Sequence, residues 1–223
     1  MILLAIDTSG KNGSIALTRA ASESATDLEI LDVVPLEGGT FSAQLVPQIS
    51  NLLKSHTLTK NDVDAFVVVS GPGSFTGLRV GSAAIKALAE ILQKPIAAVS
   101  RLEAVTRSAS RPDSVAVIDA GRGEFYVGEY ELGKRPRMLS EHLLSREELL
   151  SNLRDRFIVT PDAGIADAAQ KSGLIVEKIP DPRADVIARL GWEKIRSHET
   201  ISPEDLEANY IRRSDAEIFA KRS

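Results

Sequence analysis

Two short apolar segments, each closed by an Ile-Asp pair, place the tightest constraint on the fold of this chain. They span residues 2–7 and 115–119, and each leads into a glycine-containing turn and then a segment with alternating apolar residues. A continuous apolar run of this length is typical of a strand buried on both faces. The recurrence favours an internal duplication. Chance is the alternative, because a strand followed by an acidic turn is common.

The first half of the chain predicts an antiparallel meander followed by a βαβ unit. Asn12-Gly13 is a strong hairpin signal because both residues tolerate positive φ. Pro47 falls inside a helical pattern, and since it removes a backbone donor it predicts a bend or a late helix start. The expected elements are strands at 2–6, 14–18 and 28–34, a helix at 42–55, a strand at 65–69, a helix at 77–92 and a strand at 95–99.

The second half again alternates strands and helices. The expected elements are strands at 115–119, 124–131, 157–159 and 174–176, helices at 146–153, 164–171 and 184–196, and a last helix at 203–210 with Pro203 in its first turn. The short segment at 108–112, which contains Ser and Pro, is the best candidate for the boundary between two lobes. The sequence therefore predicts an α/β protein with lobes at 1–108 and 109–223, the last helix returning to pack on the first lobe.

Composition excludes several classes of protein. The chain has 223 residues, 43% of them hydrophobic and 26% charged, which is typical of a globular protein. It contains no Cys, so disulfides, zinc ribbons, iron–sulfur clusters and thiol nucleophiles are excluded. The net charge of -4 argues against autonomous binding of nucleic acid. No apolar stretch is long enough for a signal peptide or a membrane helix, so we expect a soluble, cytoplasmic protein.

A glycine-rich loop at 71–77, GPGSFTG, lies between an expected buried strand and an expected helix. Phosphates often bind at that position, through free backbone N–H groups and the helix dipole. The spacing fits neither familiar nucleotide loop, because Thr76 stands at the third glycine of a dinucleotide fingerprint and Leu78-Arg79 replaces the Lys and Ser/Thr of a Walker loop. Two interpretations stay open: a tight turn that permits close backbone approach, and a contact site for an anion or a partner.

Other candidate chemistry is sparse. Asp7 and Asp119 follow the two buried strands, where each could hold a metal or a water in a nucleotide cleft or could cap its own turn. His56, His142 and His198 are far apart and show no HExxH or HxxxH spacing, so a histidine-built metal site is not expected. No G-x-S-x-G elbow is present either.

The expected helix at 77–92 is apolar nearly all round and rich in small residues. Its charged residues are Arg79, Lys86 and Glu90. A helix of this kind is either buried within its own domain or covered by a partner. Small side chains would let a second backbone approach closely, so both readings of the helix stay open.

Five motifs together resemble the TsaB (YeaZ) family. They are IDTS at 6–9, GPGSFTGLRVG at 71–81, VSRLEA at 99–104, DAGRGEFY at 119–126 and NYIRRSDAE at 209–217. The GPGSFTGLR stretch is specific, and the others support it in order over most of the chain. The resemblance implies a fold of the actin-like ATPase superfamily, with two RNase H-like lobes that each carry a mixed sheet flanked by helices.

The same resemblance implies a non-catalytic subunit required for threonylcarbamoyladenosine (t6A) formation in tRNA. Such proteins pair with the transferase TsaD and help to dock the ATPase TsaE. A homodimer is expected for the isolated chain, contact with tRNA only through the complex, and no contact with a membrane. No cofactor is expected on the subunit alone, whereas ATP or ADP with Mg²⁺ would act at the level of the complex.

In that family, the first two helices of the N-terminal lobe associate with the matching helices of TsaD or of a second copy. The partner-binding residues implied here are Leu45, Ile49, Arg79, Val80, Ala83, Ala84, Ala87 and Ile91. The residues implied to face a nucleotide or phosphate are Asp7, Thr8, Ser9, Gly71, Gly73, Ser74 and Thr76. No catalytic residue and no metal ligand is implied.

This sequence departs from the relatives in three places. TsaD relatives bind a metal through HxxxH, whereas residues 40–44 read TFSAQ, which argues against transferase activity here. The family often has His-Ser-Glu where Phe41-Ser42-Ala43 stands. It usually has a second Arg where Gly121 stands, while Arg122 remains.

Two other classes of function compete with this reading. The first is a small actin-fold ATPase or kinase that would use Asp7, Thr8 and Asp119 around Mg²⁺. The second is a regulatory dimer without tRNA chemistry. Hydrolysis of nucleotide by the isolated chain would indicate the first class, and homodimers that never bind a TsaD would indicate the second.

Overall fold

The structure, a computed structural model, describes residues 1–133 and 137–211 and divides the chain into two units. The first unit consists of Met1–Ser100 and Arg183–Asn209, and the second of Arg101–Pro182 together with Tyr210 and Ile211. The expected boundary at 108/109 is therefore corrected, because the chain leaves the first unit after Ser100 and returns to it at Arg183.

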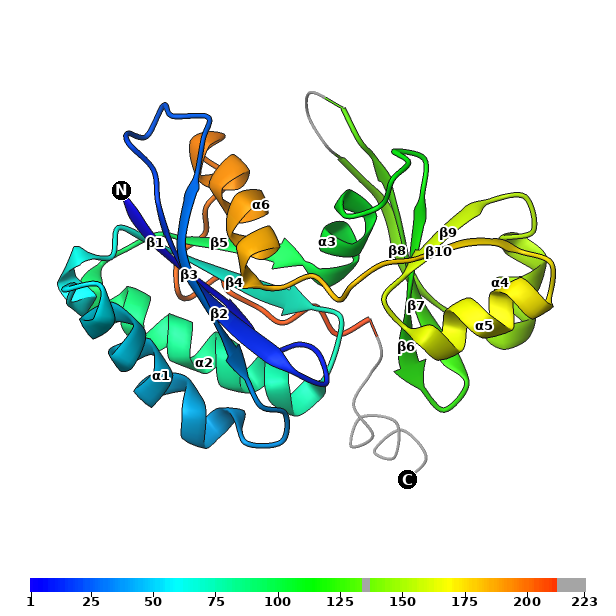
Figure 1. Ribbon diagram of the computed structural model, residues 1–223, viewed down its shortest axis with the longest axis horizontal. Helices are drawn as coiled ribbons and strands as arrows, with labels where there is room; N and C mark the ends of the chain where they lie inside the picture. Colours follow the sequence, from blue (N-terminus) through cyan, green and yellow to red (C-terminus); the bar gives the residue numbers. More distant parts are fainter. Residues whose placement is uncertain (134–136, 212–223) are drawn as a thin grey trace. The chain divides into compact units, whose positions relative to one another are not determined.

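The first unit contains a five-stranded mixed sheet in the order β3-β2-β1-β4-β5 (Figure 1). β1, β2 and β3 pair antiparallel, whereas β4 is parallel to β1 and β5 is parallel to β4. This confirms the predicted meander and the parallel βαβ pairing. The strands are β1 (Ile2–Asp7), β2 (Gly13–Arg19), β3 (Glu29–Leu36), β4 (Ala65–Gly71) and β5 (Ile96–Ser100).

Three helices cover the two faces of this sheet: α1 (Phe41–Ser55), α2 (Phe75–Leu92) and α6 (Ala184–Arg196). The inward residues of α1 and α2 form one apolar cluster with Phe66 and Val68 of β4. Val67 lies between them and meets Gly191 of α6. Since neighbouring side chains of a strand point to opposite faces, α6 packs on the face that α1 and α2 leave open.

The second unit repeats this arrangement with a sheet in the order β10-β9-β6-β7-β8. β6, β7 and β8 pair antiparallel, and β9 and β10 follow in parallel. Read from β8, this is the strand order of the first sheet, as the internal duplication predicts. The elements are β6 (Val115–Gly121), β7 (Glu124–Glu131), β8 (Arg137–Ser145), β9 (Phe157–Thr160), β10 (Ile175–Lys178), α3 (Arg101–Arg107), α4 (Arg146–Asn152) and α5 (Ala163–Lys171).

One helix of each unit follows, in the sequence, the last strand of the other unit. α3 follows β5 in the sequence, yet Leu102 and Val105 pack against Ile118 and Tyr126 of the second sheet. α6 follows β10, yet it packs on β1, β2, β4 and β5 of the first sheet. This exchange explains why a single cut in the sequence could not divide the units.

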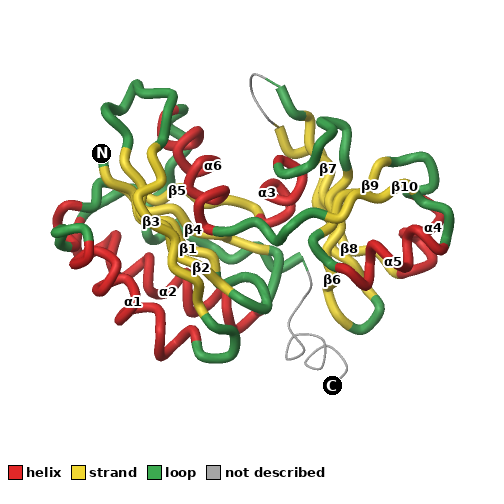
Figure 2. The backbone as a smooth tube through the Cα atoms, in the orientation of Figure 1, coloured by secondary structure: helices red, strands yellow, loops and turns green. Residues whose placement is uncertain are grey.

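Three local predictions are wrong or incomplete. α1 begins at Phe41 and continues through Pro47, so the helix does not start late. The predicted helix at 203–210 is absent, and Figure 2 shows the chain after α6 as loop. Ile201, just before this segment, bridges Ile96, and within the segment the Asn209 N–H donates to the Ser70 carbonyl. α3 and β8 were not predicted, and residues 212–217 of the last motif lie outside the described residues.

Among the described residues, no helix is both long enough and apolar enough to cross a membrane.

The contact of α6 with β4 yields a test of the fold. A Cβ added at Gly191 would lie 2.2 Å from Cγ1 and 2.5 Å from Cγ2 of Val67. Because a valine side chain has little rotamer freedom in a packed sheet, we expect Gly191→Ala to destabilise the protein by about 1–3 kcal/mol in urea unfolding. Gly164→Ala is the control, since its Cβ would meet nothing within 4 Å. Equal midpoints for the two variants would contradict this packing.

Candidate functional site

The turn after β1 is buried and bonded to itself. Asp7 is only 5% exposed, and its Oδ1 accepts hydrogen bonds from both the backbone N–H (2.8 Å) and the hydroxyl (2.6 Å) of Ser9. Thr8 and Ser9 are buried as well. This is the turn-capping arrangement that the sequence left as one of two alternatives for Asp7.

The glycine-rich loop packs directly on this turn. The Ser74 N–H donates to the Ser9 carbonyl at 2.7 Å, and the Thr8 hydroxyl donates to the Gly77 carbonyl at 2.7 Å. A Cβ at Gly73 would lie 2.3 Å from the Ser9 carbonyl oxygen, and one at Gly77 would lie 2.0 Å from that of Thr8. The glycines are therefore needed for close backbone approach, which favours the structural interpretation of the loop. We call residues 7–9 and 71–77 together the turn–loop junction.

The turn–loop junction does not fit a nucleotide phosphate between its two segments. A phosphate site at a helix start needs backbone N–H groups that are open to the ligand. Here the Ser74 N–H donates to Ser9, and the Gly77 N–H donates to the Ser74 hydroxyl at 3.2 Å. Thr76 is exposed, and Gly71 has φ +125 beside the Asn209 carbonyl.

Asp119 differs from Asp7 in both exposure and direction. Its carboxylate is exposed and accepts the Gly121 N–H at 2.8 Å. Ile6 packs toward α1 and α2, whereas Ile118 packs toward α3. The two Ile-Asp pairs are thus shifted by one residue relative to the strand pleat. Asp7 points away from the sheet face that α1 and α2 cover, whereas Asp119 points to the face that α4 and α5 cover. A comparison of the two motifs by residue type does not reveal this difference in side-chain direction.

The prediction that Leu45 and Ile49 bind a partner is wrong. Leu45 is 1% exposed and Ile49 is 6% exposed, and both belong to the apolar cluster between the helices and the first sheet. Helical spacing predicted their shared face correctly, but that face covers the sheet. Val80 and Ala84 are half-buried against the same cluster.

The opposite side of the helix pair is open in the described chain. Arg79, Ala83, Ala87 and Ile91 of α2 are exposed, as expected for partner-binding residues. Val46 of α1 was missed, although it is 63% exposed. We call these five residues the helix-pair surface. Ile91 is 71% exposed, and the Arg79 guanidinium stacks on the Phe75 ring at 3.8 Å. The surface combines exposed aliphatic groups with small residues that allow close approach.

Comparison with known proteins places the chain among proteins of tRNA modification. Residues 33–157 match the family model described as TsaD: tRNA N6-adenosine threonylcarbamoyltransferase. The chain is 29% identical over 231 residues to the tRNA threonylcarbamoyladenosine biosynthesis protein TsaB of Bacillus subtilis, covering 97% of this chain and 96% of that protein. Over 230 residues it is 27% identical to TsaB of Escherichia coli, covering 97% and 96%.

Solved structures agree with this comparison. YeaZ from Pseudomonas aeruginosa matches with a TM-score of 0.75 at 25% identity, covering 94% of this chain and 99% of that one. The activator of 2-hydroxyisocaproyl-CoA dehydratase from Clostridium difficile matches with a TM-score of 0.51 at 12% identity, covering 89% and 97%. This second match concerns the fold alone. The expectation of two lobes with an actin-like ATPase fold is confirmed.

The turn–loop junction can be tested by adding one methyl group. Gly77→Ala would place Cβ against a backbone carbonyl that cannot move without shifting β1, so we expect it to lower the free energy of unfolding by about 1–3 kcal/mol or more. Thr76→Ala, at the exposed neighbouring position, should stay within about 0.5 kcal/mol. Urea unfolding of both variants measures the difference. A Gly77→Ala protein as stable as Thr76→Ala would show that the junction is not tightly packed.

Proposed function

The chain belongs to the threonylcarbamoyltransferase family of TsaD and, within it, to the TsaB (YeaZ) group, and on this basis we propose that it is a non-catalytic subunit of t6A formation in tRNA. It would pair with the transferase TsaD, hold it in an active state and help to dock the ATPase TsaE. The isolated chain would form a homodimer through the same surface. Since the complex acts on tRNA, we place the chain in the cytoplasm.

The helix-pair surface is the observation that carries this proposal. The inner sides of α1 and α2 already cover the first sheet, so their outer sides remain for a partner. The exposed residues of the two helices include the aliphatic Val46 and Ile91 and the small Ala83 and Ala87. A partner helix can approach such a surface closely and remove its apolar area from water.

A supporting role fits the chemistry better than a catalytic one. Residues 40–44 carry no histidine, so the metal-binding pattern of the transferase is not available there. Asp7 and Thr8, which an ATPase or kinase would need near Mg²⁺, bond to Ser9 and Gly77. We therefore propose that ATP or ADP with Mg²⁺ acts only in the assembled complex, and that tRNA is contacted through the complex.

Substitution of the helix-pair surface tests the partner. Ala83→Arg and Ala87→Glu would bury an unpaired charge in a helix contact, so each should weaken the TsaD heterodimer and the homodimer about tenfold or more. Both positions are exposed, so the thermal melt should not change. Ala21→Arg, in an exposed loop of the same unit, is the matched control. Size-exclusion chromatography with light scattering gives the readout. Pairing that survives both substitutions would remove this surface from the proposal.

Reconstitution separates the accessory role from the enzymatic alternative. TsaD, TsaE and a source of threonylcarbamoyl-adenylate should form t6A in tRNA only when this chain is added. The chain alone should form none, and its own ATP turnover should lie far below the roughly 1 s⁻¹ of an ordinary enzyme. ATP turnover at that rate, abolished by Asp7→Ala, would favour the ATPase reading. A homodimer that never binds TsaD would favour the regulatory dimer.

A further inference from the structure

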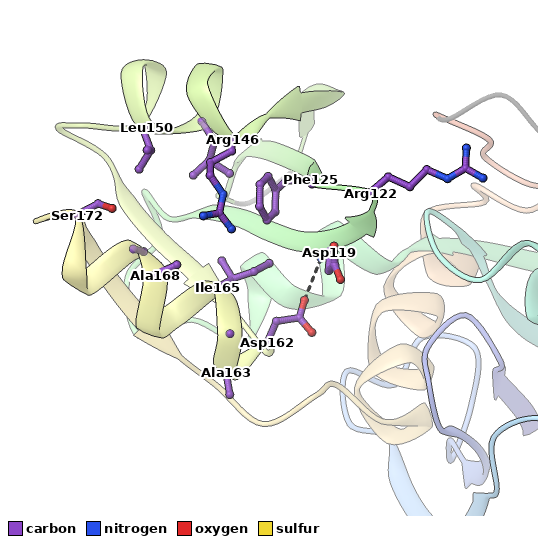
Figure 3. Close-up of a pocket in the computed structure, with 14 residues that line it drawn as sticks. Asp119, Arg122, Phe125, Arg146, Leu150, Asp162, Ala163, Ile165, Ala168 and Ser172 are labelled. Atoms are coloured by element: carbon purple, nitrogen blue, oxygen red, sulfur yellow. Dashed lines mark hydrogen bonds between the residues drawn. The ribbon is translucent and has the colours of Figure 1, made fainter. Parts of the chain in front are cut away.

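The second unit contains a pocket of about 460 Å³ between α4, α5 and the turn from β6 to β7 (Figure 3). This volume lies within the range of about 300–1,000 Å³ that is usual for small-molecule sites. None of the helix-pair surface takes part in it. The pocket is therefore separate from the partner contact proposed above.

The pocket exists because a junction that is closed in the first unit is open in the second. In the first unit, glycines of the loop and of α2 lie against the turn after β1, and a Cβ at Gly77 would be 2.0 Å from a backbone oxygen. In the second unit, a Cβ at Gly164 of α5 or at Gly123 of the β6–β7 turn would meet nothing within 4 Å. No backbone of the turn therefore lies against α5 at Gly164, and a space of ligand size remains there.

Apolar side chains form most of the pocket wall. Phe125 of β7 presents an aromatic ring to the pocket. Leu149 of α4 and Ile165 of α5 line the same space. Ala168 adds a small, half-buried side chain that leaves room. A flat apolar group would stack on the Phe125 ring and lose contact with water.

The charged groups of the pocket are not equally satisfied. Asp162 accepts the Asp119 N–H at 2.9 Å, and Asp119 accepts the Gly121 N–H at 2.8 Å. Arg122 extends away from the pocket in Figure 3. Arg146 extends from the start of α4 toward α5, beside the Phe125 ring (Figure 3). Within the described chain it forms no ion pair. Asp119 and Asp162 form no ion pair within the described chain either, so the pocket has a positive group beside the Phe125 ring and two negative groups nearer the β6–β7 turn.

We propose that this pocket binds a small aromatic anion. The ring lies on Phe125 between α4 and α5, and a carboxylate or phosphate group on the ring pairs with the Arg146 guanidinium. A guanidinium binds either group through two parallel hydrogen bonds. The carboxylates of Asp119 and Asp162 repel the anionic group from the opposite end, which orients the ligand. This inference does not rest on the proposed function, since it requires neither a partner nor tRNA.

Simple probes test the proposal on the intact chain. Hydrocinnamate, phenyl phosphate and phenethylamine share a phenyl ring and differ in charge. Titration of the isotope-labelled chain, followed by NMR, should shift amide signals of the β6–β7 turn and of α5 with at least one anion. The cation should bind about tenfold more weakly or not at all. The tighter of the two anions identifies carboxylate or phosphate as the preferred group.

Matched variants assign the charge and the cavity. Arg146→Glu should weaken binding of the anion about tenfold or more, whereas Arg154→Glu, an exposed arginine outside the pocket, should not. Ala168→Phe should fill the space and abolish binding, and thermal melts identify any variant that fails to fold. If Arg146→Glu does not fold, Ala168→Phe decides the test. The proposal is overturned by absent shifts in the intact chain, by equal binding of the cation, by unchanged binding in Arg146→Glu, or by binding to a folded Ala168→Phe protein.

Discussion

The packing of α2 on the turn after β1 is the contact on which the first unit depends. Thr8 and Ser9 bond to Gly77 and Ser74, and the glycines at 73 and 77 leave no room for a side chain between the two backbones. The hydrogen bonds satisfy backbone groups that would otherwise be buried without partners. Because α2 is held by its first turns, its inner side covers the sheet and its small-residue side faces outward.

The exchange of helices gives each sheet its second layer. The first sheet would expose the apolar face around Val67 without α6, and the second would expose Ile118 and Tyr126 without α3. Each exchanged helix follows the last strand of one sheet and covers the other sheet. The first unit is therefore not a continuous piece of the chain, because α6 returns to it after all the strands of the second unit.

The duplicated units have diverged at equivalent positions. α2 has 18 residues and begins in close contact with its turn, whereas α5 has 9 residues and has open space at Gly164. The longer helix has an exposed outer side of small and aliphatic residues. The shorter one leaves a pocket between charged and aromatic side chains. The same strand order thus carries two different local arrangements, and a fold by itself does not define a function.

The sequence by itself determined the elements with strong local signals. Apolar runs located the central strands, Asn12-Gly13 located the first hairpin, and helical spacing located α2 and α6 to within a few residues. The motifs shared with the TsaB family located the fold and the helices proposed to bind a partner. Tertiary contacts decided the rest. The segment at 203–210 is turn and loop instead of helix, because β5 pairs with Ile201 just before it and the Ser70 carbonyl of β4 accepts the Asn209 N–H near its end. Leu45 was placed on the wrong side, because helical spacing identifies an apolar face without stating what covers it. The packing of distant segments likewise decides which sheet α3 and α6 cover. It also decides that a pocket remains beside Arg146. No single local stretch of the sequence encodes these contacts.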